Sequence, residues 1–296
     1  MGTAFGFVEN FLKEVGKWEK YQQNFISWRM LYSRFWCENI DNAGFNEPEK
    51  RHLQKLLSQV MSVEKIKKAK KEDHYFYSNT IDWNSRFYEA KNKILDCAIE
   101  VVSFDIFDTL IFRPFSEPTD LFYFVGEKLR IMNFKELRKQ MEKKARNQCY
   151  QIKGHYEVTL EDIWKQIEHE IGISKTKGMQ VEIEKEQQFC YANPLMQEIY
   201  KEIKKRGKTI IIVSDMYLPK SVLQEILEGN GYGGYEKLYV SCEYEKSKWN
   251  GELYEVVKQE YSGKIIHIGD NRQSDVVMAR KKGIDTCYYF NICNLP

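Results

Sequence analysis

The chain has 296 residues, of which 43% are hydrophobic and 30% charged, and its net charge is +2. It is long enough for one large or two ordinary domains, and its composition is typical of a globular protein rather than of a disordered or collagen-like chain. No apolar run reaches the roughly 18 to 20 residues of a membrane span, and charged residues interrupt the N-terminal segment where a signal peptide is apolar. We therefore expect a cytoplasmic protein.

The seven cysteines are scattered along the chain without a C-x-x-C pair, and the five histidines do not cluster with them. We expect reduced thiols that serve mostly as small core residues. A structural zinc site needs closely spaced Cys and His ligands, so none is expected.

Residues 1–96 predict a helical N-terminal extension. Aromatic side chains recur there at helical spacings, and Gly44 and Pro48 mark a break. Packing of this aromatic stripe onto the main domain is the simpler interpretation; docking of a protein partner is the alternative, because large aromatics are also favoured at interfaces. The lysine-rich segment 62–74 predicts a solvated helix face. Nucleic-acid or membrane binding is not expected, because the chain lacks a domain-wide basic excess.

From residue 99 the sequence changes to short, apolar, β-branched runs bounded by polar residues or glycine, as expected for strands covered on both faces. Helical patterns separate most of these runs, which predicts βα repeats and a parallel sheet. The fold class is therefore α/β, with a doubly wound, Rossmann-like core formed by residues 97–113 and 195–296. The predicted strands lie at 99–105, 209–215, 237–241, 264–270 and 285–290.

The long separation between the first two strands predicts an inserted helical domain, residues 114–194, with no strand pattern. Ser116 before Glu117 and Pro118 is typical of a helix start, and Thr159 with Asp162 resembles a capping box. Because the insert follows the first strand, we expect it to form a cap over the strand ends. Its helical segments are expected at 116–132, 134–150, 159–172 and 179–192.

Polar side chains gather at the carboxyl ends of the predicted strands, where ligands bind in open parallel sheets. Any one strand-end aspartate is most often a turn residue or a helix cap, but four such elements in this order indicate a site. Several carboxylates at one rim repel each other unless a cation lies between them, and oxygen ligands suit Mg²⁺. In chain order the rim residues are Asp105, Ser214 with Asp215, Ser241, and Asp270 with Asp275.

A metal at this rim would keep Asp105 ionised as a nucleophile and would neutralise charge on a phosphoryl group. A hydroxyl such as that of Ser214 and an ammonium such as that of Lys248 would hold the phosphoryl oxygens. The residues by themselves thus predict phosphoryl transfer at a Mg²⁺ site.

Four motifs carry a resemblance to a known family: FDIFDTL around Asp105, IIIVSD with Ser214, SKWNGELY with Lys248, and IHIGDNRQSD with Asp270 and Asp275. With them the sequence resembles the haloacid-dehalogenase superfamily of hydrolases over residues 99–290, and the insert lies where members of the first cap class carry a helical C1 cap. The strings FDIFDTLIFR and SDMYLP further resemble a bacterial branch associated with glycosyltransferases and surface-polysaccharide clusters.

The resemblance implies a role for each motif residue. Asp105 would be the nucleophile that forms an aspartyl-phosphate, and the cap would close over the substrate and expel water. The implied metal ligands are Asp105, the backbone carbonyl of Phe107, Asp270 and Asp275. The implied phosphate-binding residues are Thr109, Ser214 and Lys248.

The match departs from the family at one place. Most phosphatases of the family carry D-x-D, in which the second aspartate protonates the leaving oxygen and later activates water, and Phe107 occupies that position here. Asp108 comes one residue later, where the family usually has glycine. Either the loop turns so that Asp108 takes the acid/base role, or the enzyme lacks that group and acts on a substrate with a good leaving group, as the dehalogenases do.

We expect a Mg²⁺-dependent phosphohydrolase of a small phosphorylated metabolite, a sugar or polyol phosphate, with Asp105, Asp108 and Lys248 as catalytic residues. The alternatives are a 2-haloacid dehalogenase and a catalytically weak module that binds a phosphosugar or a partner enzyme. The Asp270/Asp275 pair favours the phosphatase, because halide displacement needs no metal. Three further cations are interpreted as core or surface residues, with substrate contact as the alternative: Arg113, Arg146 and His155.

Overall fold

The computed structural model describes residues 91–113 and 118–289 of the chain. The predicted N-terminal extension therefore lies outside the described residues except at its end, where residues 91–95 are helical. Among the described helices, none combines the length and the apolar character that crossing a membrane requires.

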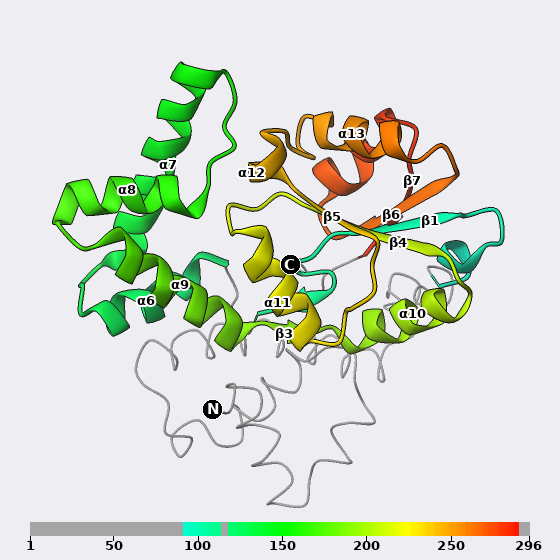
Figure 1. Cartoon of the computed structure of the whole chain (residues 1–296), viewed down its shortest axis with the longest axis horizontal. Coiled ribbons are helices and arrows are strands. Elements are labelled where there is room, and N and C mark those ends of the chain that lie inside the picture. The colour runs from blue at the N-terminus through cyan, green and yellow to red at the C-terminus, as the bar shows by residue number, and fades with distance from the viewer. Residues whose placement is uncertain (1–90, 114–117, 290–296) are drawn as a thin grey trace, which may run out of the picture.

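Five parallel strands form the central sheet, in the order β5-β4-β1-β6-β7 (Figure 1). Each strand coincides with one of the apolar runs, so the predicted parallel α/β core is confirmed. Because β1 pairs with both β4 and β6, its carboxyl end lies at the middle of the rim. The strands are β1 (Val101–Phe104), β4 (Thr209–Ser214), β5 (Lys237–Val240), β6 (Ile265–Gly269) and β7 (Asp285–Tyr288).

Helices cover both faces of this sheet, so successive residues of a strand enter different apolar clusters. Ile210 and Ile212 of β4 pack in the cluster that contains α10 (Pro194–Lys205) and α11 (Lys220–Gly229), whereas Ile211 and Val213 pack against the opposite layer. That layer contains α13 (Glu252–Glu260) and α14 (Ala279–Lys281), which lie across the sheet from α10 and α11 (Figure 1). Burial on both faces explains why the strand sequences are mostly apolar, without a regular polar alternation.

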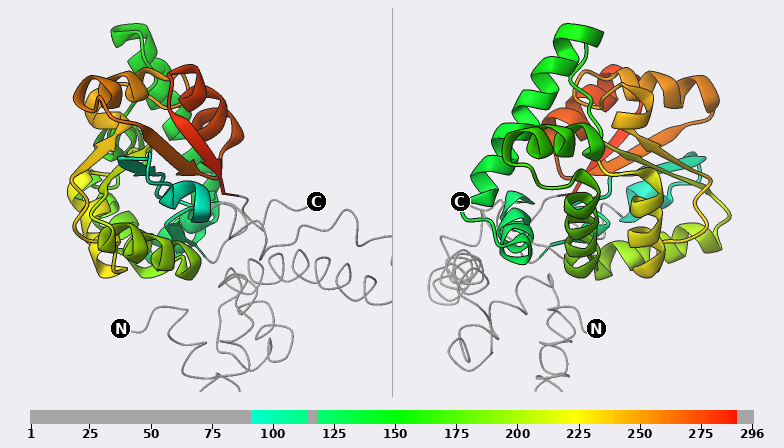
Figure 2. Two further views of the ribbon diagram at one scale, coloured as in Figure 1. Left: turned by 90° about the vertical axis from the view of Figure 1, so that its right-hand side faces the viewer. Right: turned by 60° about the vertical axis from the view of Figure 1, so that its left-hand side comes forward.

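Between β1 and α10 the described residues form four α-helices, which pack mainly on one another and stand as a group beside the sheet core (Figures 1 and 2). Residues 118–189 are called the helical insert below. The capping box predicted at Thr159 and Asp162 is confirmed, whereas the proposed helix start at Ser116 lies outside the described residues. The insert contains the 3₁₀ turn η2 (Pro118–Asp120), α6 (Leu121–Leu129), α7 (Phe134–Lys153), α8 (Leu160–Ile171) and α9 (Lys175–Phe189).

The expectation that residues 114–194 contain no strand was wrong. Tyr191–Ala192 forms β3, which pairs antiparallel with β2 (Ile111–Phe112). A strand of two residues is too short to show alternation in the sequence, so tertiary pairing alone decides it. The β2–β3 ribbon is where the chain leaves the core for the insert and returns from it.

Candidate active site

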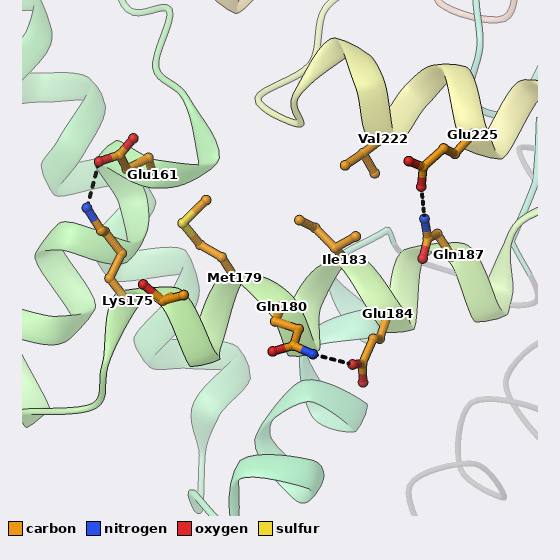
Figure 3. A pocket seen from close by; sticks show the side chains of 10 residues that line it. Glu161, Lys175, Met179, Gln180, Ile183, Glu184, Gln187, Val222 and Glu225 are labelled. Carbon is orange, nitrogen blue, oxygen red and sulfur yellow. Dashed lines mark hydrogen bonds and ion pairs between the residues drawn. The ribbon is translucent and has the colours of Figure 1, made fainter.

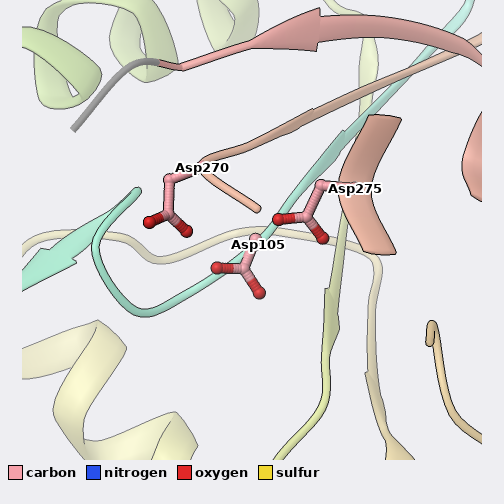
Figure 4. Close-up of side chains that lie close together, drawn as sticks. All are labelled: Asp105, Asp270 and Asp275. Atoms are coloured by element: carbon pink, nitrogen blue, oxygen red, sulfur yellow. The ribbon is translucent and has the colours of Figure 1, made fainter. Parts of the chain in front are cut away.

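Three carboxylates meet at the middle of the rim. Asp105 follows β1 directly, Asp270 follows β6, and Asp275 lies in the π-helical segment η3 (Arg272–Met278). Each offers an oxygen atom, and these oxygens all lie within 4.8 Å of one another (Figure 4). The structure thus brings together three of the four metal ligands that the sequence proposed.

The sequence IGDNRQSD explains how Asp275 reaches this position. A Cβ atom at Gly269 would lie 2.3 Å from Oδ2 of Asp275, so only glycine permits the approach. The backbone N–H of Asn271 donates to the same oxygen over 3.0 Å. The side chain of Asn271 in turn accepts from the backbone N–H groups of Gln273 and Ser274 and so starts η3. The turn after β6 therefore fixes the carboxylate through backbone geometry.

Lys248 reaches the carboxylate cluster from the loop that precedes α13. Its Nζ lies 2.5 Å from Oδ1 of Asp105 and 2.7 Å from Oδ1 of Asp275, and its side chain is only 2% exposed. The backbone N–H groups of Lys248 and Trp249 donate to the Asp215 carboxylate over 2.7 and 3.2 Å. Asp215 therefore holds the loop that delivers the lysine, a positioning role that sequence reasoning did not assign to it.

A buried histidine below the rim is a second residue that sequence reasoning missed. Nε2 of His267 lies 3.3 Å from Oδ1 of Asp275, and Nδ1 lies 2.7 Å from Oγ of Ser103. Ser103 and His267 are register partners on the adjacent strands β1 and β6. A polar residue at the same level of two otherwise apolar strands was the available clue, because buried polar groups need a partner.

Thr109 and Ser214, the two hydroxyl residues proposed to bind phosphate, both lie at the rim. Ser214 is the buried last residue of β4. Oγ1 of Thr109 is buried and has no hydrogen-bond partner among the described residues, while its backbone oxygen accepts from Nδ2 of Asn193. A buried hydroxyl without a partner is costly, and a phosphoryl oxygen is the kind of acceptor that would satisfy it.

Asp108 adopts a left-handed backbone with φ of 59°, a conformation that glycine adopts most readily and that aspartate tolerates. Its N–H donates to the Ile111 oxygen over 2.7 Å, so the loop turns sharply. The charge of Asp108 helps to raise the pKa of Asp270, and it also acts on Arg113. Its carboxylate therefore lies within electrostatic range of both Asp270 and Arg113. The guanidinium of Arg113 lies 3.9 Å from the centroid of the Phe107 ring.

The cluster holds three carboxylates and one ammonium, that of Lys248, and the pKa values of the carboxylates are shifted accordingly. Burial, together with the neighbouring carboxylates, raises the pKa of Asp105 to about 7 and that of Asp270 to about 8. Burial also opposes ionisation of Asp275, but Lys248 and His267 outweigh it and hold the pKa of Asp275 low. Although burial disfavours its charged form, Lys248 stays protonated because Asp105 and Asp275 keep its pKa well above the usual value.

One lysine does not neutralise three carboxylates, and the donor set consists of closely spaced oxygens. Hard oxygen ligands of this number and spacing are what Mg²⁺ prefers, with water or a substrate oxygen completing its coordination. The residues present therefore fit the proposed metal ion.

Arg146 and His155, which the sequence offered as possible substrate contacts, interact with other residues. Arg146 pairs with Glu142 over 2.8 Å and donates to the backbone oxygen of Tyr156 over 2.8 Å. His155 lies beside Cys149 and 3.4 Å from Glu245. These are contacts within the insert and between the insert and α12 (Ser241–Tyr244) with its C-cap, rather than contacts with the carboxylates.

A groove of about 670 Å³ lies between α8, α9 and α11, away from the carboxylates (Figure 3). Its polar side chains largely pair with each other: Lys175 with Glu161 over 2.6 Å, and Gln187 with Glu225 over 2.7 Å. None of the rim residues lines it. The groove therefore separates part of the insert from the core without belonging to the candidate active site.

No protein-family model matches the sequence, and no curated protein matches it. Solved structures that resemble the chain include the following three. A HAD-family enzyme variant from Bacteroides thetaiotaomicron, in complex with magnesium and inorganic phosphate, is 14% identical, with a TM-score of 0.47 over 65% of this chain and 95% of its own. The HAD-hydrolase YfnB from Bacillus subtilis, bound to magnesium, is 14% identical, with a TM-score of 0.47 over 64% and 88%.

The third is a 2-haloacid dehalogenase from Pseudomonas syringae pv. Tomato, 16% identical, with a TM-score of 0.46 over 64% and 86%. Likeness at these identities and scores supports no inference about activity. The parallel sheet and the meeting of Asp105, Lys248, Asp270 and Asp275 at one rim agree with the arrangement that the sequence predicts.

Proposed function

We propose that the chain is a Mg²⁺-dependent phosphohydrolase that acts on a small phosphorylated metabolite, a sugar or polyol phosphate, through an aspartyl-phosphate on Asp105. The observation that carries the proposal is the buried cluster of Asp105, Asp270 and Asp275 with the ammonium of Lys248 between two of its members. A carboxylate at a strand end, hydrogen-bonded to a lysine ammonium, supports the proposed role of Asp105 as a nucleophile.

In the first step an oxygen of Asp105 attacks phosphorus, the P–O bond to the leaving group breaks, and its electron pair stays on the leaving oxygen. Water then attacks the aspartyl-phosphate, which releases inorganic phosphate and restores the carboxylate. Lys248 and the hydroxyls of Thr109 and Ser214 would hold the phosphoryl oxygens. Mg²⁺, when held by Asp105, Asp270, Asp275 and the Phe107 carbonyl, would neutralise charge on the phosphoryl group.

The leaving oxygen needs a proton unless it is a weak base. Phe107 has none to give, and Asp108 is the adjacent carboxyl, whose charge acts on Asp270. A general acid contributes about 10² to 10⁴ in rate, so Asp108 is proposed to serve alkyl phosphates, and esters with a good leaving group need it less. The insert supports water exclusion, because Leu160 N at the start of α8 donates to the Tyr217 oxygen in the loop after β4, over 2.7 Å.

One observation favours the dehalogenase alternative, namely the absence of an acid at Phe107, since a departing halide needs no proton. The carboxylate cluster opposes it, because halide displacement by Asp105 needs no divalent metal and gains nothing from two further acidic groups. Release of chloride from 2-chloro acids without added metal would support dehalogenation instead.

The decisive experiment is release of phosphate from a generic aryl phosphate with and without Mg²⁺. We expect release by the wild type only with Mg²⁺, and its loss in Asp105→Asn, which keeps the shape of the side chain but removes the nucleophilic oxygen. If the wild type releases no phosphate from a broad panel of phosphate esters, a module that binds a phosphosugar or a partner enzyme becomes the better explanation.

A further inference from the structure

The ring of Phe107, the residue at which the motif departs from the family, is held by an ion pair. The guanidinium of Arg113 lies 3.9 Å from the ring centroid. Nε and Nη2 of Arg113 donate to the two carboxylate oxygens of Glu186, each over 3.0 Å. Glu186 lies in the last turn of α9. Phe107, Arg113 and Glu186, called the Phe107 clamp below, therefore connect the Asp105 loop with the helical insert.

Burying the charges of Arg113 and Glu186 costs solvation free energy, so stabilisation of the fold alone is a poor explanation for the clamp. The side chains of Arg113 and Glu186 are only 8% and 2% exposed. Burial and the nearby charge of Glu182 raise the pKa of Glu186 even though Arg113 opposes the rise, so the ion pair does not fully offset these two unfavourable effects. Buried ion pairs often contribute no more stability than apolar residues of the same volume, and their best-attested role is to specify one arrangement.

The position of the clamp indicates which arrangement it specifies. Arg113 directly follows β2 and Glu186 precedes β3, so the pair lies beside the two-stranded crossing between core and insert. Next to Glu186, Gln187 donates to Glu225 of α11 over 2.7 Å, whereas nearer the start of α9 the groove separates the helix from the core (Figure 3). The last turn of α9 is thus tied to the core at the clamp.

We propose that Arg113 is a positioning residue that sets the conformation of Phe107, and with it the metal-binding loop, according to the position of the helical insert. The inference rests on the proposed function, in which the carbonyl of Phe107 is a metal ligand. When α9 shifts, Glu186 shifts with it, and Arg113 moves too because it is hydrogen-bonded to Glu186. The guanidinium of Arg113 stacks on the Phe107 ring, so the ring is displaced as well. Phe107 carries both the ring and the carbonyl, so the loop next to Asp105 responds.

The test replaces the pair as a unit, Arg113→Met with Glu186→Leu, so that no unpaired buried charge remains. Two readouts are measured: the Mg²⁺ dissociation constant by calorimetry, and hydrogen exchange of the Asp108 and Ile111 amides, which donate within the loop over 2.7 and 2.8 Å. We expect about 10- to 100-fold weaker Mg²⁺ binding, as for groups that orient metal ligands, and faster exchange of both amides.

The matched control is the other buried arginine pair of the insert, Arg138 with Glu182. It is also bidentate, at 3.0 and 2.8 Å, fully buried, and stacked on an aromatic ring, that of Phe122 at 4.5 Å. Arg138→Met with Glu182→Leu should leave both readouts within about twofold of wild type, because the further contacts of this pair are with Glu142, Trp164 and Tyr217.

Two further variants separate positioning from charge balance. Arg113→Lys keeps the charge and loses the planar face and the second hydrogen bond, and we expect it to behave like the replaced pair. Phe107→Leu alone should weaken Mg²⁺ binding similarly, and adding the pair replacement should change little more.

Wild-type exchange rates and Mg²⁺ affinity in the folded, pair-replaced protein would overturn the inference, as would a wild-type result for Arg113→Lys. A wild-type protein that binds no Mg²⁺ would instead contradict the proposed function, and the exchange readout would still decide whether the clamp sets the loop.

Discussion

A hydrogen-bonded chain supports Asp275 from inside the sheet. It runs from Ser103 through His267 to Asp275 and on to Lys248, at 2.7, 3.3 and 2.7 Å. Burial lowers the pKa of His267 despite its bond to Asp275, which favours the neutral ring. The bonds are then consistent with the Ser103 hydroxyl donating to Nδ1 and Nε2–H donating to the carboxylate.

We therefore expect His267→Phe to lower kcat/KM about 10- to 100-fold, because the carboxylate loses a donor that orients it. His267→Gln, which keeps an N–H donor, should lose much less. Steady-state kinetics at saturating Mg²⁺ measure both. Tyr254→Phe is the control: its ring packs edge-on against His267 and its hydroxyl donates to the Ser274 oxygen. Equal losses in all three variants would point to core packing instead.

The role of Asp108 can be decided by the leaving group. Asp108→Asn should lower turnover of alkyl phosphates about 10²- to 10⁴-fold if the carboxyl donates the proton. Turnover of an aryl phosphate should change far less, because its leaving oxygen departs without protonation. The ratio of the two rates in one preparation is the measurement, so partial unfolding cancels. An equal loss on both esters would indicate that Asp108 acts through the charge of Asp270 and does not protonate the leaving group.

At the residue level the sequence could place the rim carboxylates and Lys248, because strand ends of a parallel sheet meet at one edge. It could not place Asp108, whose direction depends on one left-handed dihedral angle. Nor could it find the Phe107 clamp, since Arg113 and Glu186 are 73 positions apart and only packing brings them together. The sequence shows that Phe107 departs from the family motif, but it does not show that Arg113 and Glu186 hold the Phe107 ring.

At the level of elements, prediction succeeded where a period extends over many residues. All five strands of the sheet were found because each is apolar on both faces, and α7 and α8 because their apolar residues recur at helical spacing. The β2–β3 ribbon was missed because each of its strands has two residues. Its stability depends on the neighbours that surround it, which no local pattern expresses.

The capping box of α8 gives a quantitative test at this level. Oγ1 of Thr159 accepts from the Asp162 N–H over 3.2 Å, and the Asp162 carboxylate accepts from the Thr159 N–H over 3.1 Å. Thr159→Ala should lower the free energy of unfolding by about 1 kcal/mol, as measured by urea denaturation. The control is Ser174→Ala, at an N-cap without a side-chain hydrogen bond, which should change stability little. Equal losses would show that the capping bonds contribute nothing specific.

The same cap carries a pH dependence whose sign can be worked out. Burial opposes ionisation of Asp162, but the hydrogen bonds from Thr159 outweigh it and lower its pKa. Because the folded pKa is the lower one, the stabilisation is present above the unfolded pKa of about 3.9 and is lost as the pH falls through the folded value. The difference between Thr159→Ala and wild type should therefore shrink below pH 4.

For the whole molecule, the carboxylate cluster exists only when the sheet is folded. Asp105 and Asp270 follow neighbouring strands, yet 165 positions separate them along the chain (270 − 105), with the insert and two further strands of the sheet between. Folding must therefore bring like charges together in a buried place, and one lysine offsets only part of the repulsion. A cation that binds this cluster binds the folded state and not the unfolded chain.

Mg²⁺ should accordingly stabilise the folded protein by about 2.7 kcal/mol at a concentration 100 times its dissociation constant. For a domain of this size each kcal/mol raises Tm by roughly 2 to 4 °C, which thermal unfolding with and without Mg²⁺ would detect and a chelator would reverse. Asp270→Asn should abolish the shift. Asp285→Asn is the matched control, because this exposed aspartate begins β7 and pairs with Lys264 over 3.2 Å. If Asp270→Asn keeps the full shift, the ion acts elsewhere, since a cluster with one carboxylate fewer cannot bind it equally well.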